Sequence, residues 1–169
     1  MEERTQRVSL QTVESWLRDL GLKPLQSADR DGIRSWDIVI DGRVRLGVPM
    51  TLILDPSVGL VAWAQYAPPL ADSLRKVYRQ LLSWNDELPF VKFAIGEDGQ
   101  PVLSDEVASA NLTRDAVGLT IARLVAVCDL LYPESARWVD RVAKQDAAAG
   151  DAGIRLLERY ADQLREFSA

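Results

Sequence analysis

The chain has 169 residues, of which 47% are apolar and 27% are charged, enough for one globular domain with a hydrophobic core. A net charge of −5 argues against tight direct binding to nucleic acid, because neutralisation of phosphates dominates that affinity. The sequence contains no histidine, which removes the commonest general base and most zinc sites. Its single cysteine, Cys128, excludes an internal disulfide and lies in an apolar stripe that predicts a buried thiol.

The composition also bears on where the protein works. Met1–Arg7 is charged and no apolar segment follows it, so we expect no signal peptide and a cytoplasmic location. Charges or prolines interrupt the apolar runs before they reach the roughly 18 residues that a membrane span needs. We therefore expect no membrane association.

The first predicted helix begins after Ser9, whose side chain can cap it. Gly21 is placed to end this helix in the left-handed conformation. Between them, apolar residues recur at helical spacing at Val13, Trp16, Leu17 and Leu20. A turn at residues 29–32 then leads into the strands.

Alternating apolar residues predict three strands, over residues 33–40, 44–54 and 60–66. A two-residue turn at Asp41 and Gly42 would pair apolar with polar side chains. We therefore expect Ile40 to pair with Val44 through a three-residue loop or a bulge. Pro49 cannot donate a ladder hydrogen bond, which predicts an edge or a bulge at that point.

The second half of the chain begins with a predicted helix from about Asp72 to Glu87, which Pro89 ends. A hairpin of strands at 90–95 and 102–107 follows. Thr113 caps a third predicted helix with an apolar stripe at Val117, Ile121, Leu124, Cys128 and Leu131. We expect Pro133 to end it, before two further helical pieces marked by Trp138, Val139 and Val142 and by the stripe Leu157, Tyr160, Leu164 and Phe167.

This order is α-β-β-β-α-β-β-α plus a helical C-terminal tail. Strands joined by tight turns favour the α+β class, with a small twisted antiparallel sheet and helices packed on it. We divide the chain into a domain at 9–133 and a helical extension at 134–169.

The sequence predicts no catalytic, cofactor-binding or metal-binding residues. Ser73-Leu74-Arg75-Lys76 matches the S-x-x-K pattern of serine acyl-enzymes, but the patterns that accompany it there are absent. Paired carboxylates occur at 86–87, 97–98 and 105–106, where solvated turns or helix ends are expected. No glycine-rich phosphate loop is present.

Several aromatic and apolar residues are candidates for protein binding. Phe90 is predicted on the strand face opposite Val91, where it is either an exposed interface anchor or covered by the tail. Trp63 and Tyr66 on the third strand are further candidates. The tail stripe adds Leu157, Tyr160, Leu164 and Phe167, which can dock on the chain's own sheet, on a second subunit or on a partner. We favour docking within a dimer, over the open sheet face or across to the second subunit.

One stretch carries a resemblance to a known family. It runs Leu81-Leu82-Ser83-Trp84-Asn85-Asp86-Glu87-Leu88-Pro89-Phe90-Val91-Lys92-Phe93-Ala94-Ile95 and continues with Glu97-Asp98-Gly99. It resembles the signature of the YbjN-like family, also labelled as bacterial sensory transduction regulators. Leu124-Val125-Ala126-Val127-Cys128-Asp129-Leu130-Leu131-Tyr132-Pro133 is similar to the closing helix of that family.

The resemblance implies a fold similar to that of type III secretion chaperones, which usually work as homodimers. It implies a non-enzymatic, chaperone-like adaptor or regulator that binds an unidentified partner protein, and it brings no catalytic residue and no cofactor. The alternative is a small-molecule sensor or enzyme with a pocket between sheet and helices.

Overall fold

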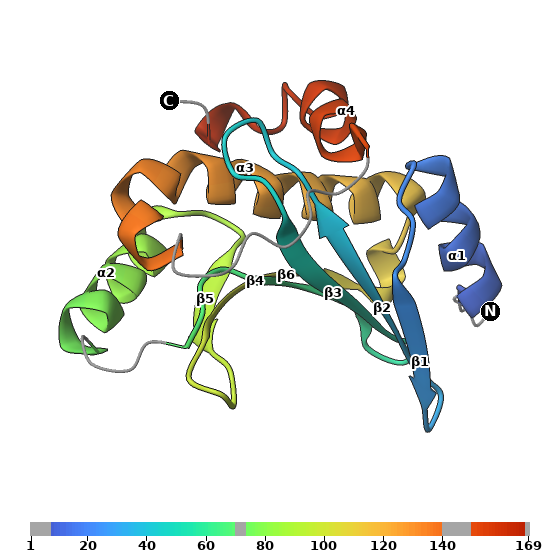
Figure 1. Ribbon diagram of the computed structural model, residues 1–169. Coiled ribbons are helices and arrows are strands. Elements are labelled where there is room, and N and C mark those ends of the chain that lie inside the picture. Colours follow the sequence, from blue (N-terminus) through green and yellow to red (C-terminus); the bar gives the residue numbers. More distant parts are fainter. Residues whose placement is uncertain (1–7, 70–73, 140–149, 168–169) are drawn as a thin grey trace.

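The computed structural model describes residues 8–69, 74–139 and 150–167, which form a six-stranded sheet and four α-helices (Figure 1). The helices are α1 (Leu10–Asp19), α2 (Leu74–Glu87), α3 (Arg114–Val139) and α4 (Ala152–Arg159). The strands are β1 (Gln26–Arg30), β2 (Ile33–Ile40), β3 (Val48–Asp55), β4 (Gly59–Gln65), β5 (Lys92–Ile95) and β6 (Pro101–Ala108). Two short 3-10 helices follow β6 and α4, η1 (Ser109–Asn111) and η2 (Arg165–Phe167).

The sheet is antiparallel throughout, with the strand order β1-β2-β3-β4-β6-β5. Strands β1 to β4 form a meander, and α2 then carries the chain to the far edge, from which β6 returns beside β4. This architecture confirms the predicted α+β class and is consistent with the fold that the resemblance implies. Strand β4 therefore lies near the middle of the sheet, with β3 and β2 on one side and β6 and β5 on the other.

The register between β2 and β3 differs from the prediction. Ile40 pairs with Val48 rather than with Val44, and residues 41–47 form a loop in which Val44 is exposed. Val44 and Val48 are an even number of residues apart, so the apolar faces still match as expected. Pro49 pairs with Val39 of β2, but the pairing of β3 with β4 begins only at Met50, so at this proline β3 has a neighbour on one side alone, as the predicted edge requires.

Helix α3 fixes that loop from above. The Asp129 carboxylate accepts backbone N–H hydrogen bonds at 2.7, 3.0 and 2.8 Å from Arg43, Val44 and Arg45. Gly42 is tightly enclosed there, because an added Cβ would lie 2.3 Å from an Asp129 oxygen.

One face of the sheet and one side of α3 enclose the core. The predicted α3 stripe is buried there, as are α1 residues Val13 and Leu17. The sheet contributes every second residue of its strands, including Trp36, Ile38, Ile40, Met50, Leu52, Leu54, Leu60 and Leu103.

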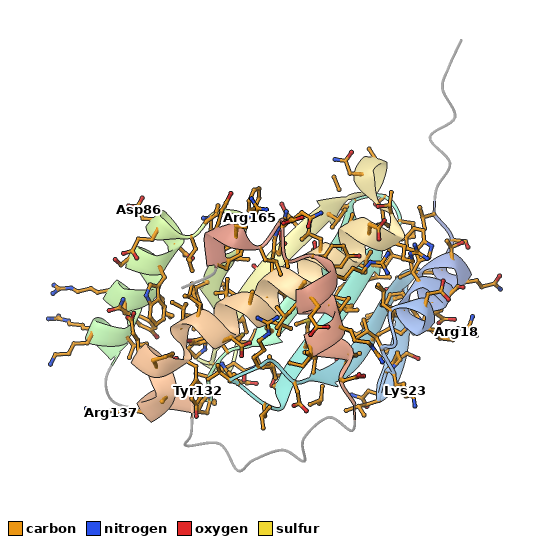
Figure 2. The ribbon with its side chains drawn as sticks, turned by 90° about the horizontal axis from the view of Figure 1, so that it is seen from above. Arg18, Lys23, Asp86, Tyr132, Arg137 and Arg165 are labelled. Atoms are coloured by element: carbon orange, nitrogen blue, oxygen red, sulfur yellow. The ribbon has the colours of Figure 1, made fainter. Side chains whose placement is uncertain are left out.

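The tail forms a third layer on the outer side of α3. Figure 2, which looks down on the helices, shows α4 and η2 lying across α3, and Arg165 marks η2. A Cβ at Gly118 would lie 2.5 Å from the Tyr160 hydroxyl oxygen, so glycine permits this close approach. The Tyr160 hydroxyl donates to Asp115 at 3.0 Å, and Arg159 pairs with Asp115 at 2.8 Å. The tail therefore docks on its own helix α3, and the expectation of docking over the open sheet face is wrong.

Several expected element bounds are also wrong. Strand β1 occupies residues where only a loop and a turn were expected. Helix α3 continues through Pro133 to Val139, so the proposed boundary between 133 and 134 falls inside a helix, and the two-part division stays a prediction. Strand β5 begins at Lys92 rather than at Phe90. Asp72, Ser73 and Val142 lie outside the described residues.

Helix α3 bears on the membrane question. Its segment Arg114–Arg137 is long and apolar enough to cross a membrane. This differs from the expectation that charges or prolines interrupt every apolar run too early for a span. The sheet covers one side of this helix and the tail covers another, so its apolar composition fits the core helix of a soluble protein.

Candidate protein-binding surfaces

Phe90 lies in the link between α2 and β5, in an unusual backbone conformation. Its φ is +67°, and the Val91 N–H donates to the Pro89 carbonyl at 2.8 Å, which closes a three-residue turn around it. Such turns with a positive φ at the centre are rare and strained, above all for a bulky side chain. Strain of this kind persists only where the surrounding structure holds it, and it gathers at functional sites.

The end of α2 supplies that support. The Asn85 side chain accepts the Phe93 N–H at 2.6 Å and donates to the Phe93 carbonyl at 3.1 Å. The Lys92 ammonium donates to the carbonyl oxygens of Asn85 and Leu88 at 2.8 and 3.3 Å, at the helix end where carbonyls lack helical partners. We call these contacts the Asn85 clamp, and they join α2 to the start of β5 on both sides of the turn.

A charged pair lies beneath the Phe90 ring. The guanidinium carbon of Arg123 is 4.2 Å from the ring centroid, and Arg123 forms a salt bridge with Asp105 at 3.2 Å. Burial raises the pKa of the Asp105 carboxyl above its ordinary value of 3.8, and Arg123 opposes that rise. The Phe90 ring thus lies against the Arg123 guanidinium, which the Asp105 carboxylate holds in place, while 58% of Phe90 stays exposed.

Behind this turn lies a buried aromatic cluster. The rings of Tyr66 and Phe93 meet edge to face with centroids 5.0 Å apart, and Trp84 lies 5.5 Å from Phe93. Tyr66 is fully buried, and its hydroxyl is hydrogen-bonded to Ser135. Burial raises the pKa of Tyr66 well above its ordinary range. Tyr66 is therefore a core residue, which corrects its selection as a surface candidate.

The second surface is the sheet face that points away from α3, which we call the open face. The described helices lie above the sheet or beside it in Figure 1, not below it. Trp63 is 47% exposed near the centre of this face. Its cross-strand partners on this face are Thr51 and Ser104. The face also carries the exposed polar residues Gln65 and Glu106, and partly exposed apolar residues at Val39, Pro49, Ile53, Val61 and Val102.

The four predicted tail residues lie elsewhere. Leu157, Tyr160, Leu164 and Phe167 are all buried against the outer side of α3. As the chain is folded here, they are core residues and not available to a partner. Of the seven sequence-predicted residues, Trp63 and Phe90 alone are exposed, and the sheet separates the two.

Sequence patterns do not single out Asn85 and Arg123 as candidate functional residues. Arg123 is the one basic residue between Asp115 and Ala136 in an otherwise apolar helix, a signal that could have indicated a buried ion pair. Asn85 gave a weaker signal, as a poor helix former one turn before a proline.

The described residues offer little for catalysis. No group of three or more Cys, Asp or Glu side chains in them could hold a metal ion. Burial raises the pKa of the Cys128 thiol to about 11, which suppresses the nucleophilic thiolate. Asp105 points into the core while Glu106 is exposed on the open face, so these neighbours are not a catalytic pair. Ser73 lies outside the described residues.

Comparison with known proteins gives one family match. The model of the YbjN family, described as "Putative bacterial sensory transduction regulator", matches residues 9–137. The match includes the Asn85 clamp, Phe90, Arg123 and all six strands, and it ends before α4. A search of curated proteins finds no match.

Proposed function

Because the chain belongs to the YbjN family, we propose that it is a non-enzymatic regulator that binds a partner protein and works as a cytoplasmic homodimer. The family description supports regulation, and the resemblance described above supports a chaperone-like adaptor. The acidic composition supports action through protein contacts rather than through direct binding to DNA.

The observation that carries this proposal is the exposed ring of Phe90. An aromatic side chain held rigidly at the surface loses little conformational entropy on binding, which makes it a good interface anchor. The Asn85 clamp and Arg123 hold Phe90 in place at the cost of backbone strain. A surface turn with no binding role has no need of such support, so we assign Phe90 to the contact with the partner.

The alternative, a small-molecule pocket between sheet and helices, has less support. That space is filled by fully buried apolar side chains, among them Leu52, Leu60, Ile121 and Leu124. A buried ligand there would have to displace packed core residues.

The test compares two variants that each replace an exposed apolar side chain with an amide. Phe90→Asn removes the ring, and asparagine tolerates a positive φ, so the turn keeps its shape. Leu82→Gln is the control, since Leu82 is 67% exposed on the neighbouring helix α2. Tagged proteins are used to capture partners from native extract, and both variants are checked for wild-type melting.

We expect Phe90→Asn to lose the protein that the wild type captures, while Leu82→Gln retains it. Equal capture by all three proteins would refute the role of Phe90. Reproducible turnover of a small molecule by the purified protein would refute the non-enzymatic assignment.

A further inference from the structure

We infer that the homodimer forms by packing of the open face against the same face of a second copy, about a two-fold axis that runs along β4 at Trp63. This inference rests on the proposed homodimer and adds the surface, the axis and the residue pairs. Two sheets that pack face to face keep their strand directions within about 30° of each other.

The row of side chains that crosses the sheet at Trp63 carries the argument. From β5 to β2 the paired residues are Lys92, Ser104, Trp63, Thr51 and Asp37. Trp63 is the middle member, and Lys92 and Asp37 stand two strands away on opposite sides. With strands about 4.8 Å apart, each charge lies roughly 10 Å from the Trp63 position.

A two-fold axis along β4 makes this row complementary to itself. It places Trp63 against Trp63 of the second copy and Ser104 against Thr51. It also places Lys92 against Asp37, twice, because the two copies are equivalent. The central pair is aromatic, the next pairs hold hydroxyl groups, and the outer pairs carry opposite charges.

The alternative two-fold axis, across the strands, lacks this complementarity. It would set Lys92 against Lys92 and Asp37 against Asp37, and like charges that face each other across an interface are unfavourable. The charges therefore select the axis along β4.

Both charged groups keep free hydrogen-bonding capacity. Asp37 accepts hydrogen bonds from Gln26 and Thr51, both at 2.6 Å, and a carboxylate has about four acceptor positions. Lys92 uses two of its three donors in the Asn85 clamp. The clamp thus also fixes the position of the Lys92 ammonium at the edge of the sheet.

The rows of side chains on either side of the Trp63 row also face each other across the proposed interface. On one side Val102 faces Pro49 and Ala94 faces Val39, so apolar groups meet apolar groups. On the other side Val61 meets its own copy, and Glu106 faces Ile53. This last pair, and the contact of exposed Gln65 with its own copy in the row of Val102, are unfavourable.

The experiment uses charge exchange, with dissociation constants from sedimentation equilibrium of the full chain. Lys92→Glu and Asp37→Lys each create two like-charge contacts, and each should weaken the dimer by about tenfold or more. An equimolar mixture of the two variants should restore association, because each mixed dimer again pairs opposite charges. The double variant should also dimerise. Lys76→Glu, an equal charge change on exposed α2, is the control and should leave the dimer unchanged.

Trp63→Glu should abolish association, with folding verified by circular dichroism. A dimer that resists Trp63→Glu and both charge variants would overturn the assigned face while leaving the homodimer in place. A strict monomer at micromolar concentration would overturn both. Failure of the mixture to recover, with both single variants folded, would overturn the axis. The Phe90 capture experiment is independent of these results and tests partner binding separately.

Discussion

The Asn85 clamp gives the sharpest stability prediction. Asn85→Ala removes two side-chain hydrogen bonds to Phe93, at 2.6 and 3.1 Å, each worth roughly 0.5–1.5 kcal/mol net. Alanine stabilises the folded state by roughly 0.5 kcal/mol relative to asparagine, because it is the better helix former inside α2. We expect a net loss of about 1–2 kcal/mol in the free energy of unfolding, which corresponds to a fall in Tm of about 2–8 °C.

Urea titration followed by tryptophan fluorescence measures this loss. Asn85→Asp is the informative companion, because it keeps an acceptor for the Phe93 N–H but sets an oxygen against the Phe93 carbonyl. Gln80→Ala, on the same helix, controls for the general effect of alanine. If Asn85→Ala is as stable as the wild type or more stable, the side chain does not hold β5 and the argument fails.

Weakening the clamp should also disturb the position of Phe90. Without Asn85, the strained turn can relax, and Phe90 loses its fixed position over Arg123. We therefore expect Asn85→Ala to reduce partner capture even under conditions where the protein stays folded. Reduced stability with undiminished capture would separate the two roles and refute the link between strain and binding.

Four further outcomes follow from the structure. Leu157→Ala should cost about 2–3 kcal/mol and raise binding of an apolar dye, since Leu157 is buried on α3; an unchanged melt in a thermal scan would contradict this. Folding raises the pKa of Asp105, so its contribution to stability is present at low pH and is lost as the pH rises from 3.8 through the folded pKa. The free energy of unfolding of the wild type minus that of Asp105→Asn, measured by urea titration, should therefore fall as the pH rises. Cys128 should react with a thiol reagent only after unfolding, and rapid labelling of the native protein would show that its burial is wrong. The purified protein should not shift DNA at physiological salt in a gel assay, and a steep salt-dependent shift would disprove this.

Local patterns predicted most of the fold. The alternation in β2 and β3 identified the buried face even though the loop between them is longer than expected, because a shift by an even number of residues preserves the face. The caps at Ser9 and Thr113 were predicted correctly, since each is a contact with the next turn of the same helix. Strand β1 was missed because all its residues are exposed and none of its positions shows apolar alternation.

The candidate sites depended on contacts that sequence patterns do not reveal. Arg123 meets Phe90 and Asp105 only after α3 packs on the sheet, so neither partner could be read from spacing. The tail stripe was recognised, but its docking surface was not, because α3 is apolar on more than one side and a single stripe was assigned to it. A proline predicts a helix end, whereas tertiary packing carries α3 past Pro133.

The position of α3 between the sheet and the tail has a consequence for protein synthesis. The ribosome completes α3 at Val139, while Phe167 follows roughly 30 residues later. At about 5–20 residues per second, the outer side of this helix stays uncovered for roughly 1.5–6 s. During that interval the apolar outer side of α3, which the tail covers in the folded protein, is exposed to solvent and to chaperones that bind nascent chains. Packing of α4 and η2 then covers this side, so synthesis of the tail ends the period in which the nascent chain exposes it.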